Sequence, residues 1–332
     1  MQNTKKTGKS RIWIPSVAAV LLVLAWSGYW MFGAGWLQNQ TKQQIANLQA
    51  EGYQVSYNEM KVSGWPYRFA LTMQGVTVIA PPDQQNLQIY TPVLRVHAMA
   101  WKLSHLIVEI PQDSRIRDAQ DQNWLYSAQR SRASLVFRQG RIFRLSTELA
   151  NPVLSNQNRD AIFTAERIEM HLRPGSELDS RNVFAFATMP VWPDMPLQDI
   201  SELRLQAEVF SWASLAASKN LAIWRNAAGH LQIEEAVLAS MDASATVSGD
   251  LSIDQNGFLN GTTKVQFVQP GRLFDKLDKT RLRQDNQKLL DGIMVLTGGV
   301  KQVSLSFKLK KGGVYAGPFR LARMSPIVPS AR

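Results

Sequence analysis

The chain has no cysteine among its 332 residues. This absence excludes disulfide bonds, thiolate nucleophiles, cysteine-based zinc sites and iron–sulfur clusters. A chain without cysteine is still compatible with an oxidising compartment. Its folded body must be stabilised by an apolar core, for which a hydrophobic content of 45% is sufficient.

Catalytic motifs are also missing. The sequence contains no HExxH, GxSxG, Walker loop or Rossmann glycine set. His97 and His105 are eight residues apart on neighbouring expected strands, whereas His171 and His230 are isolated. A catalytic site should show at least one matched pattern of nucleophile and base. We therefore expect a protein that is not an enzyme and that has no cofactor and no metal.

Acidic residues are absent from two long stretches, 130–144 and the part that follows Asp291. The net charge is +11, of which residues 1–11 contribute four. Basic faces outside a membrane favour anionic lipid headgroups as partners, and we expect no nucleic acid there. Most single basic residues on a strand are simply solvated. The basic surface that we expect comprises Arg138, Arg141, Arg144, Lys308, Lys310 and Lys311.

No charged residue occurs between Arg11 and Lys42, and the stretch 12–37 is mostly apolar. About 20 helical residues cross a bilayer core, so this stretch predicts a tilted transmembrane helix. Aromatic side chains favour the headgroup level, and four of them crowd the second half of the stretch. These are Trp26, Tyr29, Trp30 and Trp36.

The flanking charges predict the orientation of this helix. Four basic residues precede it, which by the positive-inside rule places residues 1–11 in the cytoplasm and the rest outside. A cleaved signal peptide is the alternative, with small residues at Ala25 and Ser27. The apolar stretch continues well past that position, so we favour an uncleaved anchor and a body on the far side of the membrane.

The rest of the chain alternates apolar and polar residues in many short segments, a period that is typical of half-buried strands. Among them we expect a strand that carries Phe69, Leu71 and Met73, strands at 142–149, 162–172 and 183–188, and a turn at Gly140. Few helical segments separate them, which argues against a parallel α/β sheet. We expect a mainly β fold with a few helices, in which the transmembrane helix precedes a large curved antiparallel sheet or a two-part β-groove. We divide the chain into a cytoplasmic stub at 1–11, an anchor at 12–37, a β-rich half at 38–190, a second β-rich half with helices at 197–325, and a loose tail at 326–332.

Three segments break the strand pattern in the second half. Ser211 is expected to cap a short helix that carries Trp212 and Leu215. Residues 270–294 predict an amphipathic helix broken near Thr280. Residues 254–257 (DQNG) predict a hairpin turn rather than a calcium loop, because the twelfth position of such a loop would be Val265 instead of a glutamate.

Several motifs resemble one bacterial family. They are GWPYRF at 64–69, TPVL at 91–94, WRNAAGHL at 224–231 and ATVSGDLSIDQNGFLNG at 245–261. Together they resemble the envelope family known as domain of unknown function 2125, and more distantly the membrane-anchored β-rich proteins of the AsmA type. At Ala228 the chain departs from the glycine that the family pattern has. The resemblance implies an inner-membrane anchor and a periplasmic β-rich body, and it transfers no catalytic residue.

The GWPYRF motif has two interpretations. Pro66 favours an extended backbone before it and cannot donate a ladder hydrogen bond, so the motif predicts a strand entry or bulge that sets strand register. We expect Trp65 and Phe69 to pack inward. In the other interpretation Trp65, Tyr67 and Arg68 form a ligand or headgroup site, because a guanidinium pairs well with phosphate or carboxylate. We favour the structural interpretation.

Two functions remain open from the sequence. In the first, the body binds lipid or another anionic amphipath at the membrane, in lipid transport or envelope maintenance, because a curled sheet with an apolar inner face suits an acyl chain. In the second, it is a non-catalytic structural or assembly factor that holds an envelope protein as its partner.

Overall fold

The computed structural model describes residues 13–82, 86–111, 113–139, 141–192, 197, 199–278, 280, 284–297 and 299–328. The expected stub at 1–11, the expected turn at Gly140 and the end of the tail from 329 lie outside the described residues. The described part contains five helices and twenty strands that form one antiparallel sheet. The expected mainly β fold, with a long apolar helix before a large antiparallel sheet, is confirmed.

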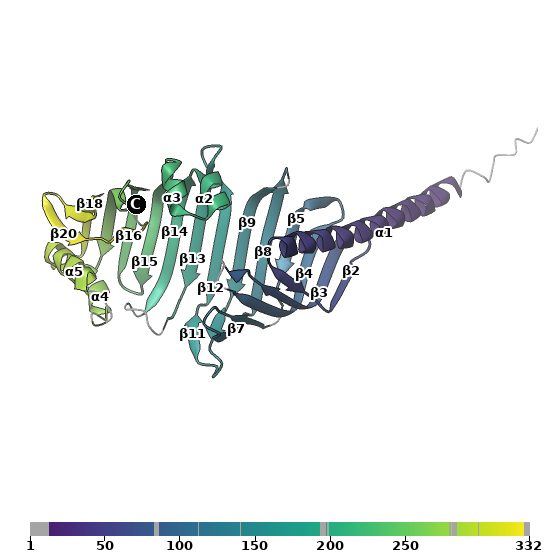
Figure 1. The fold of residues 1–332 in the computed structure, drawn as a ribbon, viewed down its shortest axis with the longest axis horizontal. Helices are drawn as coiled ribbons and strands as arrows, with labels where there is room; N and C mark the ends of the chain where they lie inside the picture. The colour runs from purple at the N-terminus through teal and green to yellow at the C-terminus, as the bar shows by residue number, and fades with distance from the viewer. Residues whose placement is uncertain are drawn as a thin grey trace, which may run out of the picture.

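Helix α1 (Trp13–Ala50) is continuous over 38 residues. It therefore joins the apolar stretch and the polar segment behind it in one helix. It is long and apolar enough to cross a membrane, and none of its residues is buried. Its first half extends past one end of the sheet, roughly along the long axis of the molecule (Figure 1).

Sixteen of the strands form the main sheet, in which β1 and β2 both pair with β3 and later strands follow mostly in chain order. The bounds of its first half are β1 (Gln54–Ser56), β2 (Glu59–Ser63), β3 (Arg68–Ile79), β4 (Gln88–Met99), β5 (Lys102–Glu109), β8 (Arg130–Arg138), β9 (Arg141–Ala150), β12 (Arg167–Pro174) and β13 (Ser180–Thr188). The second half continues with β14 (Ile200–Phe210), β15 (His230–Ser240), β16 (Ser244–Ile253), β17 (Leu259–Val268), β18 (Gln302–Lys310), β19 (Gly313–Ala316) and β20 (Phe319–Arg323).

The other four strands form a branch. It leaves the start of β4 and continues through β6, β7 and β10 to β11 (Figure 1). Its bounds are β6 (Ser114–Arg117), β7 (Asn123–Ser127), β10 (Val153–Ser155) and β11 (Ala161–Thr164). The sequence predicted one strand over 162–172, but the structure has two there, because Ala165 and Glu166 turn the chain from the branch back to the main sheet.

The remaining helices lie in two pairs. Their bounds are α2 (Trp212–Ser218), α3 (Leu221–Asn226), α4 (Pro270–Asp275) and α5 (Gln284–Thr297). Ser211 stands at the N-cap position of α2, as predicted, but its side chain makes no capping hydrogen bond. Asp179 caps the helix instead, since its Oδ1 accepts a hydrogen bond from the Ala213 amide at 2.7 Å. This partner is 34 residues away in sequence and could not be found from the local pattern.

The predicted hairpin turn at 254–257 is confirmed between β16 and β17. The Asp254 Oδ1 accepts hydrogen bonds from the amides of Asn256 and Phe258, at 2.9 and 3.0 Å. Gly257 has φ of +83°, a conformation that glycine adopts without a steric penalty. This is ordinary turn chemistry, with the carboxylate engaged by backbone amides.

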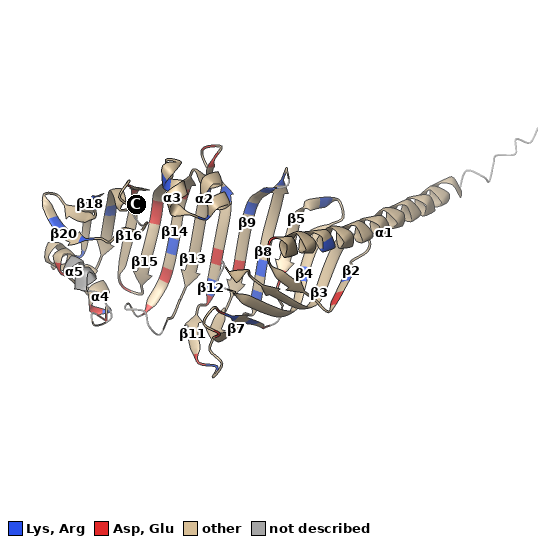
Figure 2. Ribbon diagram, in the orientation of Figure 1, with Lys and Arg blue, Asp and Glu red and all other residues tan. Residues whose placement is uncertain are grey.

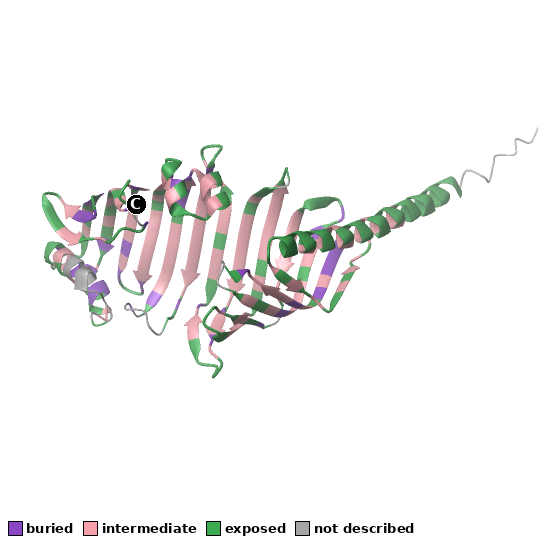
Figure 3. Cartoon of the chain, in the orientation of Figure 1, coloured by how far each residue is buried: buried purple, intermediate pink, exposed green. Residues whose placement is uncertain are grey.

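Fully buried residues concentrate near the two ends of the sheet (Figure 3). Near α1, the core holds Leu71, Met73 and Val76, against which Leu37 and Ile45 of the helix pack. At the other end, Leu273, Phe274 and Leu290 of α4 and α5 join buried residues of the sheet such as Phe267. A third cluster lies under α2 and α3 and contains Trp224, Ile253 and Val328.

We predicted an internal boundary between 190 and 197. The sheet continues across it, because β13 and β14 pair over nine residue positions from Ser180↔Phe210 to Thr188↔Glu202. The connection between these strands thus leaves and re-enters one sheet. The division of the body into two halves stays a prediction.

Candidate functional site

The two faces of the main sheet differ in chemistry, and strand register shows how. Residues paired across an antiparallel ladder point to the same face, and neighbours along a strand point to opposite faces. Following the pairs from β3 to β18 gives one face made almost wholly of apolar side chains. We call it the apolar face. Along its centre line lie Leu71, Val96, Val108, Ala133, Thr147, Met170, Ala185, Leu205, Ala236, Val247, Val265 and Leu305.

The apolar face is unusually long. Its twelve strands are separated by about 4.8 Å each, so the face runs for about 50 Å along the molecule. Between β3 and β18 the register places no acidic residue on it, and Arg181, at the end of β13, is a rare basic one. A surface of this length and composition can accept extended hydrocarbon.

Helices pack on the two ends of the apolar face, but its middle is more exposed. In β8, β9, β12 and β13, all of whose residues the structure describes, no apolar side chain is buried. Met170 at the centre is 49% exposed, whereas Leu71 near α1 is 3% exposed. The half-exposed part, from β5 to β14, measures about 24 by 13 Å, or roughly 300 Å². The branch contacts its edge, where Tyr126 of β7 donates a hydrogen bond to Ser131 of β8 at 3.2 Å. Contiguous apolar patches of this size on soluble proteins are commonly interaction sites.

The helices explain this pattern of exposure. Leu37 and Ile45 of α1 contact residues of the apolar face at one end, and α4 and α5 contact it at the other. Helices α2 and α3 pack on Val209 and Leu231, near the ends of their strands. The centre between these contacts is left without a helix, as Figure 1 shows for β9, β12 and β13.

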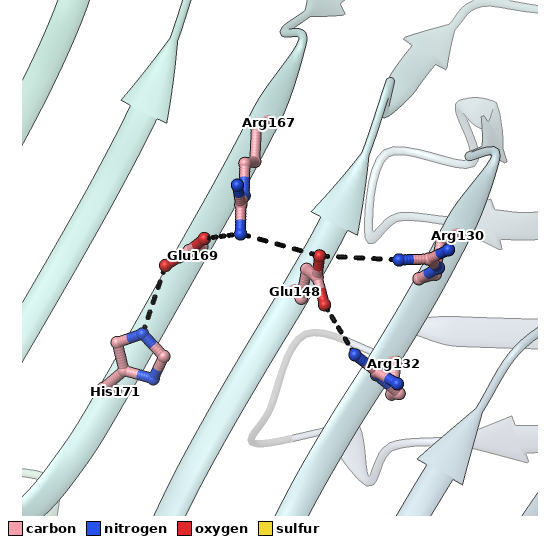
Figure 4. Close-up of polar contacts among 6 residues, drawn as sticks. All are labelled: Arg130, Arg132, Glu148, Arg167, Glu169 and His171. Carbon is pink, nitrogen blue, oxygen red and sulfur yellow. Dashed lines mark hydrogen bonds and ion pairs between the residues drawn. The ribbon is translucent and has the colours of Figure 1, made fainter.

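The opposite face carries charge, which we call the charged face. Lys and Arg alternate with Asp and Glu across β8, β9, β12 and β14 (Figure 2). In the close-up of Figure 4, Glu148 on β9 lies between arginines of both neighbouring strands. Its carboxylate oxygens lie 2.8 Å from Arg132 Nη2, 3.8 Å from Arg130 Nη1 and 3.7 Å from Arg167 Nη2.

This ladder continues on β12. Arg167 also pairs with Glu169, and the Glu169 Oε2 lies 3.3 Å from His171 Nε2 (Figure 4). The hydrogen bond from Arg132 lowers the pKa of Glu148, opposed by partial desolvation and aided by the charges of Arg132, Arg130 and Arg167. The charges of this ladder, from Arg130 to His171, therefore neutralise one another within the sheet. Such a ladder holds strands in register and leaves little net field for a ligand.

One carboxylate is buried. Glu208 on β14 accepts hydrogen bonds from the Ser176 amide at 2.6 Å, from the Ser176 hydroxyl at 2.8 Å and from the Ser180 hydroxyl. Burial would raise the pKa of Glu208, but these hydrogen bonds and one from the Glu177 amide outweigh it and lower the pKa. Ser176 and Glu177 belong to the turn between β12 and β13, and Ser180 is the first residue of β13, so Glu208 acts as a structural clamp on that turn.

The predicted residues of the GWPYRF motif come together at the turn between β2 and β3. Phe69 is 1% exposed, as expected, but Trp65 is 53% exposed, so its expected inward packing is wrong. Tyr67 and Arg68 are also exposed. The inward contacts of this turn come from α1 instead, because Trp30 stacks on Phe69 with ring centroids 5.5 Å apart.

Helix α1 holds this turn through aromatic donors, a feature that the sequence pattern missed. We expected these aromatic side chains at lipid headgroups, yet three of them donate hydrogen bonds to backbone carbonyls. The bonds join Trp26 Nε1 to Pro66 O at 2.9 Å, Tyr29 Oη to Ala100 O at 2.7 Å, and Trp30 Nε1 to Arg68 O at 3.0 Å.

The predicted basic surface falls into two separate parts. Arg138, Arg141 and Arg144 lie at the hairpin of β8 and β9, where the guanidinium carbons of Arg138 and Arg144 are 4.6 and 5.5 Å from the centroid of the Phe143 ring. Register places them on the charged face.

The lysines lie far from these arginines. Lys308 and Lys310 are exposed on β18, and Lys311 is in the turn that follows. Seven strand steps, about 35 Å, separate β18 from β9, so the structure does not bring the two basic groups together.

Among the described residues, no group of three or more His, Asp or Glu side chains is placed to hold a metal ion. His97 pairs with Glu109 and His105 with Ser134, at 3.3 and 2.8 Å. The hollows on the charged face, such as the one lined by His105, Arg132 and Glu148, are shallow gaps between paired side chains. The side chains of the charged ladder thus pair with one another, whereas the centre of the apolar face has no described helix packed on it. The apolar face is therefore our candidate binding surface.

The chain matches one known protein family over most of its length. Residues 30–325 match a family described as an uncharacterized protein conserved in bacteria, DUF2125. The chain belongs to this family. The match begins inside α1 and ends just after β20, so DUF2125 includes both the docked part of the helix and the whole sheet. No curated protein and no solved structure matches the chain.

Proposed function

We propose that this DUF2125 protein is a non-catalytic, membrane-anchored protein that binds the acyl chains of lipids, or of another anionic amphipath, along the apolar face of its sheet. Its α1 crosses the inner membrane with the N terminus in the cytoplasm, and the sheet lies in the periplasm. Its role is in lipid transport or envelope maintenance.

A single observation carries this proposal: the apolar face is continuous from the strands beside α1 to those beside α4, and it is half-exposed in between. Burying apolar surface is worth about 25 cal/mol per Å². Covering the open patch of roughly 300 Å² would therefore contribute about 7 kcal/mol before the costs of association. Hydrocarbon chains lie extended on such a surface and need no polar partner.

The orientation rests on charge and on the direction of α1. Four basic residues precede the helix, as expected for a cytoplasmic flank. Because the first half of α1 extends along the long axis of the sheet, a bilayer around it would leave the sheet standing away from the membrane (Figure 1). The apolar face would then lead from the membrane toward the distal end at β18.

The proposal is tested by photo-crosslinking from the two faces. A benzoylphenylalanine at position 170 points to the apolar face, and one at position 184 replaces Phe184 on the charged face as a matched control. In cells, we expect position 170 to crosslink to phospholipid, detected by mass spectrometry, and position 184 not to. Crosslinks from position 170 to a protein alone would favour an assembly factor that holds an envelope partner and would contradict lipid binding.

The orientation has its own test. The chain has no cysteine, so Leu178→Cys introduces a single thiol at a fully exposed turn. We expect a membrane-impermeant maleimide to label it in cells with a permeabilised outer membrane and an intact inner membrane. Labelling only after the inner membrane is disrupted would place the sheet in the cytoplasm.

A further inference from the structure

The ends of β3, β4 and β5 meet beside α1. The turn 64–68 leads into β3, and the turn 99–103 connects β4 to β5. Register aligns Arg68 with Met99 and Met99 with Lys102, so the two turns are neighbours. We call these two turns the aromatic corner.

The aromatic corner is fixed to one level of α1. Its carbonyl groups accept the three hydrogen bonds from Trp26, Tyr29 and Trp30, and the Ala100 amide donates to the Tyr67 carbonyl at 3.0 Å. A Cβ on Gly33 would lie 2.7 Å from the Phe69 ring, so the helix backbone approaches the sheet closely here. The corner therefore takes the same depth in a membrane as this part of the helix.

That depth follows from helix geometry. Arg11 is the last charge before the apolar stretch, and Trp13 is the first described residue of α1. At 1.5 Å per residue, Trp26 lies about 20 Å and Trp30 about 26 Å along the helix from Trp13. The hydrocarbon core of a bilayer is about 30 Å thick. With Trp13 at the cytoplasmic side, the corner reaches the outer leaflet instead of clearing the membrane.

The exposed side chains of the corner suit that environment. Trp65 is 53%, Tyr67 69% and Trp101 63% exposed, although each is large and aromatic. Arg68 and Lys102 accompany them, and neither turn contains an acidic residue. Aromatic rings and basic side chains are enriched where proteins meet lipid headgroups.

Turns of the same sheet that lie farther from α1 have a different composition. Residues 174–179, between β12 and β13, are PGSELD, and residues 254–257, between β16 and β17, are DQNG. Both contain acidic residues and neither contains an aromatic one. The aromatic corner thus differs from these two turns in having exposed aromatic rings and no acidic residue.

We propose that the aromatic corner inserts into the outer leaflet around α1 and is a second, interfacial lipid-binding surface of this protein. This inference rests on the anchor in the proposed function and deepens it. Insertion places Phe69 and Leu71, where the apolar face begins, at the level of the leaflet.

The experiment uses the full chain with single cysteines, which its cysteine-free sequence allows. Tyr67→Cys and Trp101→Cys probe the corner, Leu21→Cys is the control inside the bilayer, and Leu178→Cys is the control in water. Each variant is spin-labelled and reconstituted into vesicles of phosphatidylethanolamine and phosphatidylglycerol. Collision rates with oxygen, which concentrates in the bilayer, and with a water-soluble nickel chelate are then measured.

We expect labels at 67 and 101 to give oxygen-to-nickel ratios several-fold above that at 178 and below that at 21, because an interfacial position lies between water and the centre of the bilayer. Ratios at 67 and 101 that equal the one at 178, with a lipid-like ratio at 21, would overturn insertion and leave the anchor intact. A water-like ratio at 21 would overturn both. Lipid-like ratios at 67 and 101 support the corner even if position 170 fails to crosslink lipid, an outcome that would contradict only the proposed acyl-chain binding.

Discussion

A charge placed at the centre of the apolar face should abolish lipid binding without unfolding the protein. Met170→Glu is the sharpest such change, because Met170 lies midway along the face and is 49% exposed. A glutamate there can stay hydrated in the free protein. We therefore expect the free energy of unfolding to change by less than about 1 kcal/mol.

The effect on a bound acyl chain is larger. A charged side chain that faces hydrocarbon costs about 2–3 kcal/mol. Since 1.4 kcal/mol is a factor of ten, occupancy of the central strands by lipid should fall about 30- to 140-fold at subsaturating lipid. The melting temperature should shift by no more than about 4 °C.

The matched control adds the same charge on the other side of the sheet. Ser146 lies on β9, beside the strand of Met170, and pairs with His171 on the charged face. Ser146→Glu thus introduces an identical side chain one strand away. We expect it to leave lipid binding unchanged.

The assay is crosslinking of a phosphatidylethanolamine with a photoreactive diazirine in its tail to the full chain in nanodiscs. Peptide mapping then gives the yield on β9, β12 and β13. Equal yields for Met170→Glu and the wild type, with both proteins folded, would refute the assignment of the apolar face as the lipid site. An equal loss in Ser146→Glu would show that charge, and not the face, is responsible.

Three further predictions follow from named contacts. Gly33→Leu should lower the free energy of unfolding by about 1–3 kcal/mol, measured by chemical denaturation, because its side chain would enter the Phe69 ring. Gly35→Leu is the control and should cause no such loss, because a Cβ at Gly35 meets no atom within 4 Å. Equal losses would contradict the close approach. Glu208→Gln should lower the free energy of unfolding by about 1–3 kcal/mol near pH 7, because it leaves buried donors poorly paired. The pKa of Glu208 is lowered in the folded state, so the stability that the wild type gains above the unfolded-state pKa should disappear as pH falls through the folded-state pKa. The stability–pH curves of the two proteins should therefore converge in acid, and parallel curves would refute the clamp. Leu71→Ala should lower the free energy of unfolding by about 2–5 kcal/mol, since Leu71 is 3% exposed under α1. It should also loosen α1, which faster proteolysis after residue 50 would detect. A loss of stability under about 1 kcal/mol would show that this end of the sheet is not a core.

Local patterns predicted most of the elements. Alternation marked β3, β9 and β13 near their observed bounds, because strand periodicity is written in neighbouring residues. The short strands β6 and β10 were missed, because three or four residues are too few for a period to show. The capping role of Asp179 was missed because its partner amide belongs to a distant segment.

The candidate site shows the same limit. The sequence singled out Trp65, Tyr67 and Arg68 from one motif, and the structure keeps them together at one turn. It could not show that Trp101, from another turn, lies beside them, nor that α1 donates to both turns. The half-exposed face was invisible in sequence, since Met170 and Leu71 are both apolar strand residues with opposite exposure.

The sequence by itself determined the apolar helix, the strand-by-strand alternation and the absence of cysteine chemistry, because each depends only on residues close together in the chain. Only the tertiary structure decided that twelve strands align their apolar sides into one face, that the helices cover just its ends, and that α1 carries the aromatic corner with it. These properties depend on register and docking between distant segments, which no local pattern specifies.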